Sequence, residues 1–381
     1  MGGVTNRPVI LLRPVRNRFV DRFTRTPRDR ATRQATIALL LKHHQRLVDT
    51  VGVLRRWLPW VIVSIVGVAS AWADVRTAWW EGGRFPDATA DKYVTIAATD
   101  GFGAHRPFVE IADHYSVPGR PWQHPHPRPP GALTAQLPLT LIPDEWLLAA
   151  VGVITGLSVV ATGWATSRLT GWSPWLFAAG ASVAMVLWNE WTRGNVWWLL
   201  TGALVTVGWV GVREGRRWGP WLFGLAAAAK LWPALLVPAL WVTGRKRSAA
   251  ETTAVAGAFT VAGLLLPGVS LVSDFGTSGG LEFLSAAGNL SLAGWLLTLG
   301  VPYAPVVGAA VALTGWAVAL RRVRGDVEVV LAVTIVAGLL ASPLTWPAYW
   351  TAALPTLRWV LSDSHASVGS GDTVIVPTAN V

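Results

Sequence analysis

The chain has 381 residues, of which 52% are hydrophobic and only 14% are charged. This balance excludes a disordered protein and argues against an ordinary soluble enzyme, because it is typical of a protein with many membrane segments. The chain contains no cysteine. A disulfide framework, a thiolate nucleophile and a cysteine-bound zinc site are therefore excluded.

The formal net charge of +11 is concentrated in one terminal segment. Residues 1–57 hold 13 Lys/Arg and three Asp/Glu, a net charge of +10, whereas the other 324 residues hold 19 and 18, a net charge of +1. The positive-inside rule places a basic flank before a first apolar segment in the cytoplasm. We therefore expect residues 1–56 to form a basic cytoplasmic segment. No nucleic-acid partner is expected, because no base-reading motif accompanies the arginines.

The first apolar segment covers about residues 57–73, and a long polar stretch, residues 74–145, follows it. We expect the apolar segment to be a retained anchor, because the basic region before it is too long for a signal peptide. The polar stretch is expected to be a long first extracytoplasmic loop. Within it, aromatic and apolar residues of the stretch 91–115 have spacings compatible with short amphipathic helices on the membrane surface.

One of the later apolar segments, residues 218–243, has basic residues on both sides, at 213–217 and 244–247. Both flanks look cytoplasmic, although one straight helix would put them on opposite sides of the membrane. We therefore interpret this segment as a hairpin of two short helices that breaks between Lys230 and Pro233, since proline removes a helical hydrogen bond.

The remaining apolar segments complete the predicted fold. They lie at about 146–166, 174–191, 195–212, 252–271, 303–320, 327–342 and 347–361. Together they predict an all-α integral membrane protein of about ten or eleven membrane helices. Its transmembrane domain covers 57–361, its N-terminus is cytoplasmic, and residues 362–381 form a disordered cytoplasmic tail. Many of the 24 tryptophans lie at segment ends, as expected for interface anchors.

Lys230 is placed by this topology at the tip of the hairpin, on the same side as the long loop. An ionisable residue at membrane depth is a functional hypothesis by default. An ammonium group there is a suitable partner for an anionic phosphate. The alternative is a lysine that snorkels to the outer interface.

Four further polar patches fall on the same predicted side. Each alone reads as a turn, a helix start or a helix break. Their convergence on one face is what indicates a functional site. They are residues 127–131 (PRPPG), 189–195 (NEWTRGN), 288–294 (GNLSLAG) and 342–350 (SPLTWPAYW).

The order of these motifs resembles the GT-C glycosyltransferases of family 87, over roughly residues 57–361. That family includes polyprenyl-phosphate-mannose-dependent mannosyltransferases and related arabinofuranosyltransferases of actinobacteria. The chain departs from its pattern at four places. Arg128 precedes the proline pair where tyrosine is usual, and Ala348 and Tyr349 stand where a histidine is expected. Residues 194–197 (GNVW) replace a typical Gly-Gln-x-Asn, and residues 289–291 (NLS) replace Asn-Gln-Ser.

The resemblance implies inverting transfer of a single sugar, with mannose favoured, from a polyprenyl-phosphate donor to a lipid or glycan acceptor outside the cytoplasm. A carboxylate is needed to take the acceptor's proton. We expect Asp100 in this role, because it precedes a flexible Gly-Phe-Gly turn. Asp91, just before Lys92 and Tyr93, is the nearest rival, and Asp74 and Glu110 follow.

The departing phosphate needs a cation, and Lys230 is the first candidate, followed by Arg193 and Arg128. His124 and His126 could bond phosphate or sugar, or bind a metal. No third ligand accompanies this histidine pair, so no metal or other cofactor is expected. The remaining substrate-binding candidates are Asn195, Asn289, Ser291, Trp346 and Tyr349, of which the two aromatic residues could stack on a sugar.

Two other functions stay open from the sequence. A secondary transporter or flippase would use Lys230 and the broken hairpin as a binding site. Such transporters commonly have a second interrupted helix in a corresponding half, and none is apparent here, which counts against transport. The third reading is a non-catalytic membrane subunit that keeps the architecture without the chemistry.

Overall fold

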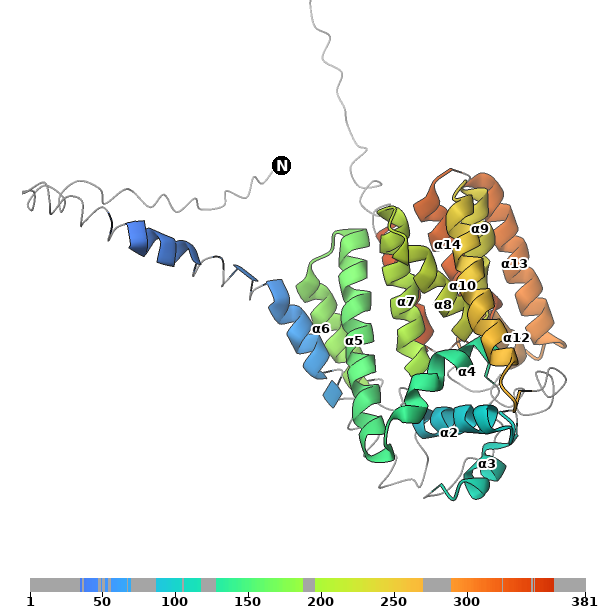
Figure 1. The fold of residues 1–381 in the computed structure, drawn as a ribbon. Helices are drawn as coiled ribbons and strands as arrows, with labels where there is room; N and C mark the ends of the chain where they lie inside the picture. The colour runs from blue at the N-terminus through green and yellow to red at the C-terminus, as the bar shows by residue number, and fades with distance from the viewer. Residues whose placement is uncertain are drawn as a thin grey trace, which may run out of the picture. The chain divides into compact units, whose positions relative to one another are not determined.

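The computed structural model describes most of the chain from residue 87 to residue 359 (Figure 1). Two compact units are present, Met1–Leu58 and Pro59–Val381. Every regular element among the described residues is helical, which confirms the predicted all-α class for that part of the chain. The described residues are 87–117, 128–187, 196–269 and 289–359, apart from 105, 324, 344 and 346, together with parts of 35–69.

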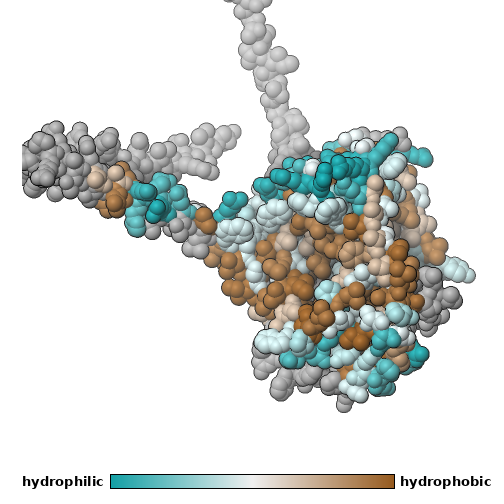
Figure 2. All heavy atoms as spheres, in the orientation of Figure 1, coloured by the Kyte–Doolittle hydropathy of each residue, from teal (hydrophilic) through white to brown (hydrophobic). Residues whose placement is uncertain are grey.

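Long apolar helices form the body of the second unit. Two of them, α5 (Asp144–Thr170) and α13 (Ala304–Arg322), are long and apolar enough to cross a membrane. Figure 2 shows an apolar band across the bundle between two more polar ends, which supports a membrane location. The number of ten or eleven membrane segments stays a prediction, because the other apolar helical stretches are shorter. Those of 10–17 residues are Arg56–Val66, Leu199–Arg213, Trp232–Val242 and Val327–Ala341.

The apolar segments predicted after the long loop each correspond to a helix. α7 lies at the centre, packed against α5, α8 and η3, and the main hydrophobic core fills this region with side chains such as Trp209, Phe223 and Leu339. The remaining bounds are α6 (Pro174–Leu187), α7 (Val196–Arg213), α8 (Trp218–Ala229), η2 (Trp232–Leu235), α9 (Leu236–Val242), α10 (Lys246–Leu264), α12 (Leu292–Thr298), α14 (Val327–Ala341) and η3 (Pro347–Thr356).

The predicted break in residues 218–243 is confirmed. α8 ends at Lys230, whose backbone is extended (φ −142, ψ 141), and η2 and α9 follow. Nη1 of Arg245, after α9, donates to the carbonyl oxygen of Val212, before α8, at 2.6 Å. Both flanks therefore lie together, as a hairpin requires. The 12 residues of α8 span about 18 Å, well short of a membrane's hydrocarbon core.

Short helices form in the predicted stretch 91–115 of the long loop: α2 (Asp87–Asp100) and α3 (Phe108–His114). Two further ones, which the sequence did not predict, follow: α4 (Pro130–Gln136) and the 3-10 helix η1 (Leu137–Leu141). α2 packs against the other three and against α5. Its fully buried face carries small residues, including Ala90, Ala97 and Ala98, whereas Tyr93 and Ile96 are only partly buried. The small side chains on this face let neighbouring helices come close to α2, and the location of these helices on a membrane surface stays a prediction.

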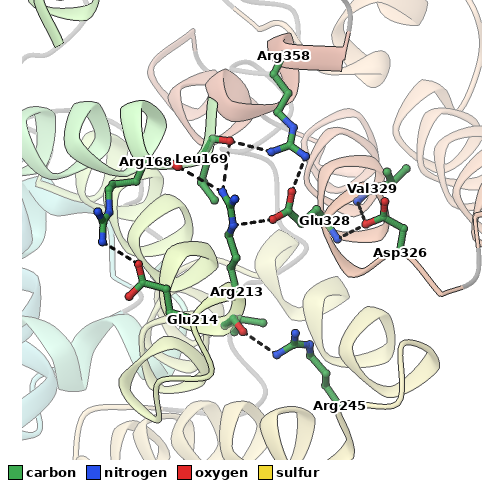
Figure 3. Close-up of polar contacts among 10 residues, drawn as sticks. Arg168, Leu169, Arg213, Glu214, Arg245, Asp326, Glu328, Val329 and Arg358 are labelled. Atoms are coloured by element: carbon green, nitrogen blue, oxygen red, sulfur yellow. Dashed lines mark hydrogen bonds and ion pairs between the residues drawn. The ribbon is translucent and has the colours of Figure 1, made fainter. Parts of the chain in front are cut away.

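The arginine end of the bundle is a cluster of charged residues: Arg168, Arg213, Glu214, Arg245, Glu328 and Arg358 (Figure 3). Glu328 Oε1 lies 2.9 Å from Arg213 Nε, and Glu328 Oε2 lies 2.5 Å from Arg358 Nη2. Arg358 Nη1 also donates to the carbonyl oxygen of Leu169 at 2.8 Å. The last carbonyls of a helix lack partners within it, and arginines supply them here. Of these residues, those in the flanks 213–217 and 244–247 were predicted to lie on one side; that this side is cytoplasmic stays a prediction.

Candidate functional site

Asp91, on α2, is fully buried and paired with Arg128, which directly precedes the proline pair at the start of α4. Arg128 Nε donates to Asp91 Oδ1 at 2.7 Å, and Nη2 contacts the same oxygen at 2.5 Å. The second oxygen, Oδ2, is buried and has no hydrogen-bond partner among the described residues. Leaving a buried polar atom unsatisfied is costly, so in a native structure it calls for an explanation.

The residues that follow Asp91 anchor α2 to the beginning of α5. Lys92 Nζ donates to Asp144 Oδ1 at 2.5 Å and to the carbonyl oxygen of Ile142 at 2.7 Å. The Tyr93 hydroxyl donates to Asp144 Oδ2 at 2.7 Å. Burial, with the hydrogen bond and the charge of Asp144, raises the pKa of Tyr93 to about 12. The phenol therefore stays a donor at neutral pH. Lys92 and Tyr93 fix α2 to α5, and Asp91 before them fixes it to Arg128.

A second buried polar contact lies one helical turn further along α2. The Thr95 hydroxyl is 2.7 Å from the carbonyl oxygen of Asp91 and 3.2 Å from Oε1 of Gln136 on α4. Gln136 is 1% exposed, and its Nε2 has no hydrogen-bond partner among the described residues. The α2–α4 contact thus contains two buried polar atoms, Asp91 Oδ2 and Gln136 Nε2, that the described protein leaves unsatisfied.

Close packing of α4 on α8 joins two of the predicted patches. A Cβ on Gly131 would lie 2.7 Å from the carbonyl oxygen of Ala228, so only glycine allows this approach without a shift. Arg128 is three residues before Gly131, and Lys230 is two residues after Ala228. The proline-proline-glycine turn and the tip of the hairpin are therefore neighbours in the fold.

The start of α7 reaches the same place. Trp197, which follows the predicted Gly194-Asn195 patch, is 3% exposed and shares a small hydrophobic core with Ala132 of α4 and Ala229 of α8. Three segments far apart in the sequence thus converge next to Lys230.

Lys230 and Tyr349, both predicted to bind substrate, lie together. Lys230 Nζ is 5.5 Å from the centroid of the Tyr349 ring, within the range of a cation–π interaction. Lys230 is half-buried, and Tyr349, on η3, is 3% exposed. The aromatic residue at the position of the expected histidine therefore faces the predicted phosphate-binding cation.

Asn289 and Ser291 join their own motif to the Ser-Pro-x-x-Trp motif. Asn289 Nδ2 and Ser291 Oγ each donate to the carbonyl oxygen of Pro343 at 3.1 Å. Asn289 Oδ1 accepts from the backbone N–H of Thr345 at 3.0 Å, and Ser291 Oγ accepts from that of Gly294 at 3.0 Å as the N-cap of α12. These contacts hold the segment that leads into η3. The substrate-binding role of both residues stays a prediction.

Asp100, the first choice for the base, lies at the C-terminal end of α2 and is exposed. Its Oδ1 accepts from the backbone N–H of Phe102 at 2.9 Å, and its Oδ2 accepts from the Tyr115 hydroxyl. Burial, together with Asp100, raises the pKa of Tyr115 above its usual value. The Asp100 carboxylate therefore stabilises the turn that was expected to expose it to the substrate. Asp91, nine residues earlier, lies about 13 Å away along the helix axis.

Six predicted site residues, among them the candidate base Asp74, lie outside the described residues, and two described ones were missed. The contribution of Thr95 is suggested only by its spacing of four residues from Asp91, and that of Gln136 by its being a lone amide in an apolar stretch. Within the described ranges, no group of three or more His, Asp or Glu side chains could hold a metal. The six residues outside them are Asp74, His124, His126, Arg193, Asn195 and Trp346.

Comparison with known proteins identifies relatives of this chain. The family model of glycosyltransferase family 87 matches residues 128–347, so the match begins at Arg128 and includes Lys230. A polyprenol-phosphate-mannose-dependent alpha-(1-2)-phosphatidylinositol pentamannoside mannosyltransferase of Mycolicibacterium smegmatis is 26% identical over 341 residues, which cover 81% of this chain and 76% of that protein. No solved structure gives a significant match.

Proposed function

The chain belongs to glycosyltransferase family 87, and on this basis we propose that it transfers a single sugar, with mannose favoured, from a polyprenyl-phosphate donor to a lipid or glycan hydroxyl. The transfer inverts the anomeric carbon and takes place on the extracytoplasmic face of the plasma membrane. The name of the M. smegmatis relative, which includes polyprenol-phosphate mannose, supports this class of donor.

The observation that carries the proposal is the state of the Asp91 carboxylate. One oxygen is held by Arg128, and the other is buried without a partner among the described residues. We assign Asp91 as the general base, in preference to Asp100, whose two oxygens are both used within the protein. A positioned base contributes typically about 10²- to 10⁴-fold to the rate.

The reaction follows from these positions. The acceptor oxygen forms a bond to the anomeric carbon as the bond from that carbon to the phosphate oxygen breaks. The acceptor's proton passes to Asp91 Oδ2, and the polyprenyl phosphate leaves as an anion. Lys230 pairs with this phosphate, and its ring partner Tyr349 keeps the ammonium group on the side of the hairpin tip.

The test is transfer by the purified protein in liposomes. Polyprenyl phosphate labelled in its mannose, or in arabinofuranose, is supplied with a lipid acceptor extract, and labelled product is separated from donor. We expect product with wild type, with Asp100→Asn and with the exposed control Asp113→Asn, but not with Asp91→Asn. Label that stays on polyprenyl phosphate in every reaction would instead favour a transporter or a non-catalytic subunit.

A further inference from the structure

We propose that Arg128 is a positioning residue that keeps the Asp91 carboxylate ionised and oriented, with Oδ1 held and Oδ2 presented to the acceptor hydroxyl. This inference rests on the proposed function for its catalytic meaning, but the charge pair itself is a property of the chain. Arg128 was first considered as a ligand of the donor phosphate, and its contact with Asp91 gives it a different task.

The geometry of the pair is one-sided. Both contacting nitrogens of Arg128 approach Oδ1, at 2.7 Å for Nε and 2.5 Å for Nη2. A side-on arrangement would use both oxygens. The one-sided contact leaves Oδ2, the oxygen with no described partner, available as a proton acceptor.

Burial makes the arginine necessary. The Asp91 side chain is 0% exposed and that of Arg128 is 11% exposed. A carboxylate without an opposite charge in such a place takes up a proton, because desolvation penalises the charged form. A protonated Asp91 cannot act as a base. Arginine suits this task because its guanidinium stays charged at any physiological pH.

In the described structure Arg128 forms the ion pair with Asp91, and the other charged groups of the neighbouring elements have contacts or positions of their own. α4 and η1 carry no further titratable residue, and Lys92 and Tyr93 on α2 are bonded to Asp144 of α5. The charged or titratable residues of α3 are exposed; they are Glu110, Asp113 and His114. Lys230, directly after α8, packs on Tyr349.

The position of Arg128 is itself fixed by the chain that follows it. Pro129 (φ −53, ψ 141) and Pro130 start α4 in a restricted backbone conformation. A Cβ on Gly263 of α10 would lie 1.9 Å from the carbonyl oxygen of Pro130, so α10 presses directly on this turn. The guanidinium therefore projects from a rigid point, which a positioning residue requires.

The experiment compares Arg128→Met, Arg128→Lys and the control Arg106→Met, whose arginine is 52% exposed and lies 3.4 Å from Glu110. The titration of Asp91 is followed by infrared spectroscopy of its protonated carboxyl band in detergent. Each spectrum is corrected with the matching variant that also carries Asp91→Asn. This readout needs no turnover.

We expect the protonated carboxyl band of Asp91 to persist to higher pH in Arg128→Met than in wild type, and the acidic limb of the pH–rate profile to move upward with it, because the opposite charge is lost. Because the base works only when deprotonated, the rate returns at high pH. Arg128→Lys, of similar length to methionine, should restore most of the shift, and Arg106→Met should cause none.

The two proposals fail in different ways. Midpoints that coincide in wild type and Arg128→Met, or a rescue by lysine no better than that by methionine, would overturn the role of Arg128. A shifted midpoint in a protein that transfers no sugar would support the charge pair and reject the transferase function.

Discussion

Each end of the helix bundle contains a buried or half-buried carboxylate, and the two carboxylates differ in how many of their oxygens have a partner. At the arginine end, Glu328 uses both oxygens, on Arg213 and Arg358, and the same arginines also donate to backbone carbonyls (Figure 3). At the other end, Asp91 uses one oxygen and leaves the other buried without a described partner. α5, 27 residues and about 40 Å long, connects the two ends.

This difference separates stability from function. Glu328 joins two arginines from different helices through its two oxygens, so we interpret the arginine end as a structural clamp. An unsatisfied buried atom reduces stability, and a catalytic role is one of the reasons for which proteins retain it. The contrast predicts that substitutions at the two ends will affect different measurements.

The largest effect is expected for Asp91→Asn, which should lower turnover by about 10²- to 10⁴-fold. It also leaves the Arg128 charge without its partner, which costs stability. The double variant Asp91→Asn/Arg128→Met removes that charge. Thermal melting should therefore recover in the double variant while sugar transfer stays low; recovery of both would show that the loss in the single variant came from misfolding.

A tenfold to hundredfold loss of turnover is expected for Gly263→Ala. The new Cβ would overlap the carbonyl oxygen of Pro130, at 1.9 Å, and displace the turn that carries Arg128. A displacement of about 1 Å at a catalytic group can cost about 10²-fold in rate. Gly257→Ala, on the same helix with nothing within 4 Å, is the matched control. Equal turnover in both variants would contradict this account of the turn.

Lys230→Met should raise the donor KM about tenfold with a smaller change in kcat, because a charge-assisted contact to phosphate is lost. Lys246 is the control. Its Nζ lies 5.6 Å from the Trp241 ring, much as Lys230 lies over Tyr349, but next to the arginine end. Lys246→Met should leave the donor KM unchanged. A KM unaltered in both variants would return Lys230 to the role of a snorkelling lysine.

The smallest effect on catalysis is expected at the arginine end. Glu328→Gln should lower the free energy of unfolding by about 1 kcal/mol, a modest value because its partner Arg213 is partly exposed. The rate per folded molecule should not change. Thermal melting and transfer by the same preparation check both statements, and a selective loss of turnover would show that the two ends are coupled.

Hydropathy and charge in the sequence predicted most of the helices. The hairpin was visible because basic residues flank both sides of 218–243 and a lysine and a proline interrupt it. The same reasoning placed the two flanks, at 213–217 and 244–247, at one end. These features depend on local composition, which a single sequence contains.

The arrangement around Asp91 was less accessible from the sequence. Its contact with Arg128 joins residues 37 positions apart, and nothing in the local pattern of either residue indicates it. The flexible-looking turn after Asp100 drew the choice of base there, although that carboxylate stabilises the turn. α2 buries alanines such as Ala90, Ala97 and Ala98, which carry little hydropathy signal, so the sequence alone does not mark its buried face.

A structure of the protein with bound polyprenyl-phosphate mannose would test the central claim most directly. The account predicts that the donor phosphate contacts Lys230 and that the anomeric carbon faces an open position next to Asp91 Oδ2. A donor bound away from Lys230, with Asp91 still enclosed by protein on every side, would contradict it.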